Sequence, residues 1–276
     1  PPRSTLFPYT TLFRSWADFN NDGLVDIYIS GYTGPSRLYQ NMNDVIFSDR
    51  SLNLPPEPAG KLTYTVALGD YDNDGLVDIY VVNFTEGCKD QLLHNSGNMA
   101  FTDATDQLGI AQVSNGKNRC AAWCDYDRDG DLDLYVGGQR NAFLFVNQGN
   151  GHFSPFSLNL YEACAATWVD YDQDGDFDLA VCQGYIGKIT MLQNDGHGSF
   201  LQTTLASNTS VHEPYISLWE DLDNDVDLDV VLLGNPTSGT GLFIWPNLCD
   251  AHVTETTRDA RFGIALQGNS TRSDYV

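Results

Sequence analysis

Five nine-residue segments of this chain place acidic side chains at alternating positions, a pattern that suits metal coordination. They are DFNNDGLVD (18–26), DYDNDGLVD (70–78), DYDRDGDLD (125–133), DYDQDGDFD (170–178) and DLDNDVDLD (221–229), and together they hold 22 of the 37 acidic residues. Carboxylates at this density repel one another strongly unless a cation neutralises them. We therefore interpret the five segments as metal-binding loops.

The type and order of the donors indicate calcium. Positions 1, 3 and 5 of each segment direct side-chain oxygens at one centre, position 7 adds its backbone carbonyl, and the aspartate at position 9 closes the shell. Oxygen-only donors in an adaptable geometry favour Ca²⁺ over zinc, copper or Mg²⁺. We expect four to five bound ions. The predicted ligands are Asp18, Asn20, Asp22, Leu24 and Asp26; Asp70, Asp72, Asp74, Leu76 and Asp78; Asp125, Asp127, Asp129, Asp131 and Asp133; Asp170, Asp172, Asp174, Asp176 and Asp178; and Asp221, Asp223, Asp225, Asp227 and Asp229.

The five sites are not expected to be equivalent. The first has Asn20 at position 3 and therefore one carboxylate fewer. The fifth has Val226 at position 6, where the other four have glycine, and a β-branched residue is strained at the positive φ that the turn requires. We expect the fifth site to be weak, distorted or empty.

An EF-hand shares the first half of this pattern, but it needs a glutamate at position 12 and a helix on each side. Position 12 is apolar in all five segments and lies inside a run typical of a β-strand. These residues are Ile29, Val81, Val136, Val181 and Leu232. The EF-hand interpretation is therefore excluded.

The sequences around the loops repeat as well, at intervals of 45 to 55 residues, and they predict the elements that carry the loops. A short run that is apolar on both faces follows each loop and predicts a buried strand. In the first four units a second apolar run ending in asparagine, a Gly/Asn/Asp turn and a run that begins with Phe come next, which predicts a hairpin. Four strands in about fifty residues without helical periodicity predict an all-β fold, a β-propeller of four-stranded blades.

Composition excludes several classes of protein. The chain has 14 basic and 37 acidic residues and a net charge of −23, which excludes an electrostatic nucleic-acid binder. It has no window of about twenty uninterrupted apolar residues, so no membrane span is predicted. None of the nucleophile, zinc-protease or phosphate-binding motifs is present, and we expect that the chain is not an enzyme.

Six cysteines in an acidic calcium protein favour an oxidising, extracellular setting. Cys164 and Cys182 fall on facing strands of one predicted hairpin, where either a disulfide or two buried thiols fits the sequence. Three N-x-[ST] sequons, at Asn83, Asn208 and Asn269, matter only in a eukaryotic source.

Tryptophan stands two residues before four of the five loops, at Trp16, Trp123, Trp168 and Trp219. Such a set suits either carbohydrate stacking or blade packing. Because each tryptophan lies on the strand that enters its loop, we interpret the set as packing residues.

The segment DYDNDGLVDIYV and its four copies resemble FG-GAP/VCBS repeats, the calcium-loop blades of integrin-α-type propellers. The resemblance covers about residues 16–250 and implies Ca²⁺ in the hairpins between the first two strands of each blade. Propellers of this family usually close with seven blades, so five visible loops imply a fragment of a seven-bladed propeller. The tail RFGIALQGNSTRSDYV (261–276) is similar to the start of the ASPIC/UnbV domain, which follows such repeats in the cartilage acidic protein family.

We divide the chain into three parts on these grounds. Residues 1–15 resemble a translated sequencing adapter, residues 16–255 form the propeller repeats, and residues 256–276 begin an ASPIC/UnbV-like domain. The expected function is that of a non-enzymatic, extracellular or secreted scaffold for adhesion to a protein or glycan ligand. The alternatives are a lectin with one sugar site per blade and a carbohydrate-active enzyme built on the same blades.

Overall fold

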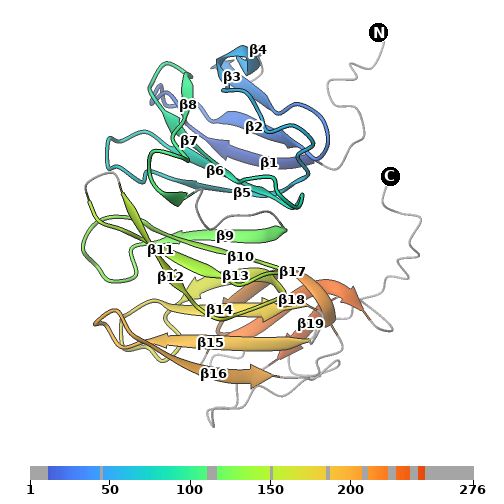
Figure 1. Ribbon diagram of the computed structural model, residues 1–276, viewed down its shortest axis with the longest axis vertical. Helices are drawn as coiled ribbons and strands as arrows, with labels where there is room; N and C mark the ends of the chain where they lie inside the picture. Colours follow the sequence, from blue (N-terminus) through green and yellow to red (C-terminus); the bar gives the residue numbers. More distant parts are fainter. Residues whose placement is uncertain are drawn as a thin grey trace.

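The computed structural model describes residues 12–43, 46–110, 117–149, 152–184, 187–206, 211–222, 228–236 and 242–245. In these residues the strands form four four-stranded sheets and one three-stranded sheet, which we call blades one to five in chain order. They follow one another from blue to orange in Figure 1. Blade one contains β1 (Leu12–Ala17), β2 (Asp26–Gly31), β3 (Arg37–Asn43) and β4 (Ile46–Asp49). A short 3₁₀ helix, Ser51–Asn53, leads out of it.

The other blades repeat this plan. Blade two contains β5 (Thr63–Gly69), β6 (Asp78–Asn83), β7 (Gln91–Asn95) and β8 (Phe101–Asp103). Blade three contains β9 (Asn118–Cys124), β10 (Asp133–Gly138), β11 (Phe143–Asn147) and β12 (Phe153–Ser157). Blade four contains β13 (Ala163–Val169), β14 (Asp178–Gln183), β15 (Lys188–Asn194) and β16 (Phe200–Ala206). Blade five contains β17 (Val211–Glu220), β18 (Asp229–Pro236) and β19 (Leu242–Trp245).

Within each blade the strands pair in chain order and antiparallel, and each acidic segment is the loop between the first two strands. The residue pairs that close the five loops are Ala17↔Asp26, Gly69↔Asp78, Cys124↔Asp133, Val169↔Asp178 and Glu220↔Asp229. The predicted order of strand, acidic loop, strand and hairpin is therefore confirmed. The segment Leu12–Ser15, which we attribute to an adapter, pairs here with β2 as part of the first strand.

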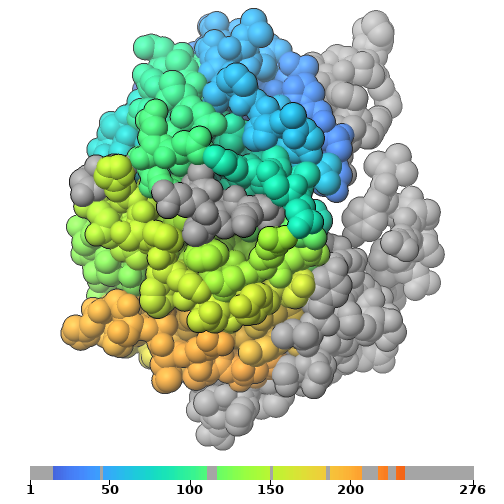
Figure 2. All heavy atoms as spheres, in the orientation of Figure 1, coloured from blue at the N-terminus to red at the C-terminus, as the bar shows by residue number. Residues whose placement is uncertain are grey.

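The hydrophobic core lies between neighbouring blades. Every residue of β2, β6, β10 and β14 is buried, as expected for strands covered on both faces. One cluster joins Tyr80 of blade two to Leu134 and Phe145 of blade three, and the next joins Tyr135 of blade three to Leu179 of blade four. The colours of successive blades accordingly meet along broad surfaces in Figure 2. This stacking of sheets face to face is the packing of a β-propeller.

Three of the four tryptophans pack between blades as expected. Trp123 stacks on Tyr71 of the preceding loop with ring centroids 6.4 Å apart, and Trp168 stacks on Tyr126 at 6.2 Å. Trp219 meets Tyr171 edge to face at 5.9 Å. The prediction is wrong for Trp16, whose side chain is 57% exposed.

The disulfide considered for Cys164 and Cys182 is not formed. Both residues are buried thiols, as are the other cysteines in the described part of the chain. A bulge between Ala163 and Ala165 pairs Cys182 with Ala165, and the Cys164 thiol instead accepts a hydrogen bond from Arg119 Nη1 at 3.0 Å. No helix in the described ranges is long and apolar enough to cross a bilayer.

Candidate metal sites in the acidic loops

Each acidic loop turns sharply because two of its residues adopt left-handed backbone conformations. The glycine at position 6 has φ of 84° in Gly23, 86° in Gly75, 94° in Gly130 and 92° in Gly175. The residue at position 4 is also left-handed, with φ between 57° and 60°, although it is never glycine in the described loops; these residues are Asn21, Asn73, Arg128 and Gln173. Only the glycines were predicted to adopt this conformation.

The turn brings carboxylate oxygens of three loops together. In loop two, Asp70, Asp72 and Asp74 place oxygens within 4.8 Å of one another. In loops three and four the groups contain positions 1, 3 and 9, namely Asp125, Asp127 and Asp133, and Asp170, Asp172 and Asp178. Positions 1 and 3 thus lie together in loops two, three and four.

Position 5 holds the turn in loops two, three and four, and in loop two Asp74 accepts the Leu76 N–H at 2.8 Å. Asp129 and Asp174 each accept the backbone N–H two residues later, at 2.9 Å, and so hold the turn. At position 7, the Asp131 and Asp176 side chains contact the preceding loop. In loops three and four these side chains lie outside the converging groups of their own loops.

The first and fifth loops differ from the others. Among the described residues the carboxylates of loop one form no group of three, in keeping with the amide at Asn20. Asn20 instead donates a hydrogen bond to Asp22 Oδ2 at 2.9 Å. In loop five only the two ends are described; Asp223, Asp225, Val226 and Asp227, and with them the predicted distortion, lie outside the described residues.

The aspartate at position 9 is almost fully buried in every loop. In loops one to four its Oδ2 accepts the backbone N–H of position 2 at 2.9–3.3 Å, and its Oδ1 accepts the backbone N–H of an asparagine at or near the end of the third strand at 2.7 Å. Despite these bonds, burial raises the pKa of Asp78 and Asp133 to about 7 and that of Asp178 to about 6. Burial therefore disfavours the charged carboxylate at position 9.

Position 1 supplies the observation that points to a ligand. The Oδ1 atoms of Asp125 and Asp170 are buried and have no hydrogen-bond partner. Buried carboxylate oxygens are nearly always satisfied, because leaving one without a donor is costly. A cation at the convergence point of loops three and four satisfies these oxygens and the charge at position 9 together, so the donor set fits a hard divalent ion.

The asparagines at the ends of the third strands join neighbouring loops, a role the sequence analysis missed. The Nδ2 atoms of Asn95, Asn147 and Asn194 donate to the carbonyl of position 2 in the preceding loop, at 2.7–2.8 Å. Each also donates to the carbonyl before its own position 9, at 3.1–3.3 Å. The recurring asparagine was visible in the sequence, but it was used only to mark where a strand ends.

Position 4 provides a second set of contacts between loops. Asn21 donates to the carbonyl of Gly75 at 2.8 Å, and Asn73 donates to Asp131 Oδ1 at 2.8 Å. Arg128 Nη1 lies 2.9 Å from Asp176 Oδ1. Loops one to four are therefore linked in series along one end of the blades.

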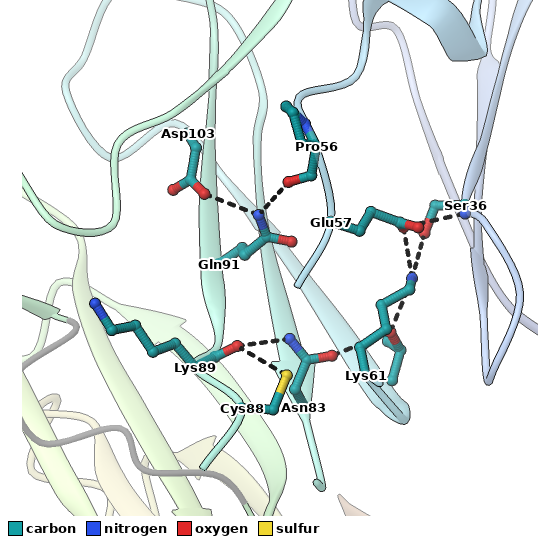
Figure 3. Close-up of polar contacts among 10 residues, drawn as sticks. Ser36, Pro56, Glu57, Lys61, Asn83, Cys88, Lys89, Gln91 and Asp103 are labelled. Carbon is teal, nitrogen blue, oxygen red and sulfur yellow. Dashed lines mark hydrogen bonds and ion pairs between the residues drawn. The ribbon is translucent and has the colours of Figure 1, made fainter. Parts of the chain in front are cut away.

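A buried polar cluster lies at the other end of blade two (Figure 3). Lys61 Nζ is paired with Glu57 at 2.5 Å and donates to Ser36 Oγ at 3.0 Å. Asn83 is fully buried and donates its side-chain amide to the carbonyl of Lys89 at 2.8 Å. Its sequon is therefore closed to glycosylation in the folded protein, and the sequons at Asn208 and Asn269 lie outside the described residues.

Comparison with curated proteins finds relatives of one kind. The chain is 33% identical over 127 residues to cartilage acidic protein 1 of Xenopus tropicalis, which covers 44% of this chain and 19% of that protein. It is 31% identical over 147 residues to the mouse and human proteins of the same name, covering 50% of this chain and 22% of each. The chain spans about a fifth of the length of these relatives.

Comparisons with solved structures and with protein families agree on the repeat. An Agrocybe aegerita lectin that recognises non-reducing terminal N-acetylglucosamine has a similar fold, with a TM-score of 0.56 and 21% identity over 89% of this chain and 65% of the lectin. The family described as FG-GAP-like repeat matches residues 18–81, 70–136, 125–181 and 170–232. Each match begins at one acidic loop and ends in the strand that follows the next acidic loop. Because these matches cover most of the sequence, the chain belongs to the FG-GAP-like repeat family.

Proposed function

We propose that this chain is the calcium-binding propeller part of a non-enzymatic extracellular scaffold. The observation that carries the proposal is the convergence of carboxylates in loops two, three and four, together with the buried oxygens of Asp125 and Asp170 that lack a partner. The same loop pattern recurs five times, each time between the first two strands of a blade. This repetition suits one structural ion in each blade.

Calcium in these loops would supply positive charge where the chain concentrates negative charge. Positions 1 and 3 would hold the ion in loops two, three and four, with Asp74 in loop two and the buried position 9 in loops three and four. We propose Asp18, Asn20, Asp22 and Asp26, and the corresponding residues 221–229, as weaker sites. Because the ligands are assembled only in the folded blade, the free energy of calcium binding adds to the free energy of folding.

The scaffold role rests on the relatives, and we extend it to this chain as a proposal. Cartilage acidic protein 1 contains a similar stretch of sequence, and the extracellular location is part of our proposal for this chain. We retain the division into residues 1–15, 16–255 and 256–276 as part of this proposal, with a protein or glycan as the partner. The tryptophans favour no lectin site, since three of the four pack between blades.

The direct test is a thermal melt of the full chain in calcium and in chelator, with analysis of the bound metal. A site saturated at about 100 times its Kd adds about 2.7 kcal/mol, which raises the Tm of a domain of this size by roughly 5–10 °C. Asp127→Asn should lose part of the calcium-dependent rise. Asp106→Asn, at an exposed ion pair with Lys89 outside the loops, should keep all of it. An unchanged Tm with no bound calcium overturns the proposal.

A further inference from the structure

Loop two has a histidine nitrogen close to its carboxylates, at a position where blades one, three and four have Gln or Val. The residue just before the loop-bridging asparagine is Gln40 in blade one, His94 in blade two, Val146 in blade three and Gln193 in blade four. The His94 Nδ1 atom lies 3.3 Å from Asp72 Oδ2 and 3.4 Å from Asp78 Oδ1, so the ring faces the carboxylates of the acidic loop.

The three donor atoms lie close together. Nδ1 of His94 is buried and makes no hydrogen bond, although two carboxylate oxygens lie close to it. The ligand atoms of Asp72, Asp78 and His94 all lie within 4.8 Å of one another. Donors at the corners of a tetrahedron with metal–ligand bonds of about 2.0–2.1 Å are about 3.3–3.4 Å apart, which is the spacing between this nitrogen and the two oxygens.

Outer contacts hold two of the three donors, Asp78 and His94. Asp78 is fully buried and accepts backbone N–H groups from Tyr71 and Asn95 at 3.2 and 2.7 Å. The Tyr71 ring meets the His94 ring edge to face, with centroids 6.1 Å apart. Ligands held by outer contacts in this way are typical of metal centres.

We propose that loop two binds a borderline transition ion of the Zn²⁺ class through His94, Asp72 and Asp78. Calcium takes oxygen ligands, whereas imidazole with carboxylate suits zinc, cobalt and related ions. This inference rests on the proposed function, in that the acidic loops are cation sites, and in loop two it replaces the calcium proposed at Asp70, Asp72 and Asp74 with a transition ion. The corresponding residue of loop four, Gln193, donates its amide to Asp172 Oδ2 at 3.2 Å and leaves that site with oxygen ligands.

The experiment is a titration of the metal-free full chain with Co²⁺ in the presence of saturating Ca²⁺, followed by visible absorption. We expect one Co²⁺ per chain with the intense absorption of a low-coordinate site, displaced by one equivalent of Zn²⁺ and retained in excess Ca²⁺. Loss of outer contacts alone weakens metal sites by about 10–100-fold, so His94→Gln should weaken Co²⁺ binding by at least about tenfold. Glutamine is a native residue at this position in blades one and four, and a calcium-dependent melt of the variant verifies its fold.

Two further variants sharpen the test. His197→Gln removes an exposed imidazole from the β15–β16 turn of blade four and should leave the cobalt spectrum unchanged. Val146→His places an imidazole at the same position of blade three and should create a second cobalt site beside Asp127 and Asp133. A spectrum that survives in His94→Gln, that is lost in His197→Gln, or that disappears on adding calcium overturns the inference.

The same measurements separate this inference from the proposed function. A calcium-dependent melt without the cobalt spectrum rejects only the transition-metal site. If the Tm does not change with calcium but the cobalt spectrum is present and is lost in His94→Gln, the calcium proposal is rejected and the transition-metal site is retained.

Discussion

At the scale of single residues, the aspartates of one loop divide into two groups with different tasks. Asp133 is buried and both of its oxygens accept backbone N–H groups, from Tyr126 and Asn147. Asp127 lies at the mouth of the same loop and accepts one long hydrogen bond, at 3.4 Å from the Asp129 N–H. Position 9 therefore holds the loop in shape with or without metal, and position 3 mainly faces the ion.

Asparagine substitutions at these two positions should separate the tasks. In Asp133→Asn the new NH₂ group faces a backbone N–H donor, so we expect a loss of about 1–3 kcal/mol in urea unfolding in chelator as well as in calcium. In Asp127→Asn we expect a change below about 0.5 kcal/mol in chelator and a loss only of the stabilisation due to calcium. If the two variants lose the same free energy of unfolding in chelator, positions 3 and 9 do not have different tasks.

The raised pKa values at position 9 predict how stability varies with pH. Burial raises the pKa of Asp78 and Asp133 to about 7 and that of Asp178 to about 6, from 3.8. Between about pH 4 and about pH 7 the folded metal-free protein binds more protons than the unfolded chain, so its stability should fall as the pH rises through this window. Calcium needs ionised carboxylates, so the rise in Tm that it produces should grow over the same window. Melts of desalted metal-free protein and of calcium-saturated protein across this range test both trends; a metal-free Tm that rises with pH contradicts them.

At the scale of elements, the asparagine that ends the third strand connects one blade to the next. Asn147 bridges the carbonyls of Tyr71 and Leu132, which belong to loops two and three. Asn147→Ala leaves these two carbonyls without their donor, and we expect a loss of about 1–3 kcal/mol in urea unfolding. Asn141→Ala is the matched control. Its amide donates to Ser157 Oγ in an exposed bond within blade three, so its loss should cost less than about 0.5 kcal/mol. Equal losses in the two variants would show that the bridge is unimportant.

These contacts also show what the sequence could and could not predict. The second strands were predictable because burial on both faces leaves an unbroken apolar run after each loop, as in IYVV (79–82) and LAVC (179–182). The acidic loops were predictable because few local folds stack carboxylates at every second residue. The bridges of Asn95 and Asn147 were not, because their partners lie 76 residues earlier in the chain and only the stacking of blades brings them together. The exposure of Trp16 and the bulge beside Cys164 likewise depend on tertiary packing.

At the scale of the whole molecule, the loops gather charge at one end of the blades. They hold 22 of the 37 acidic residues of a chain whose net charge is −23, and contacts such as Arg128 with Asp176 keep neighbouring loops together. Without metal, the carboxylates of neighbouring loops repel one another. Salt weakens this repulsion, because the Debye length falls from about 30 Å at 0.01 M to about 10 Å at 0.1 M.

The stability of the metal-free protein should therefore depend strongly on salt, and that of the calcium-loaded protein should not. Raising NaCl from about 0.02 M to about 0.5 M should increase the Tm in chelator, because screening lowers the repulsion among the loops. Calcium at each loop removes most of that repulsion, so the same salt series at saturating calcium should leave the Tm nearly constant. The calcium-loaded series is also the control for effects of salt on apolar burial, which both forms share. If the Tm depends on salt equally in the two series, calcium does not stabilise the protein by reducing the repulsion among the loops.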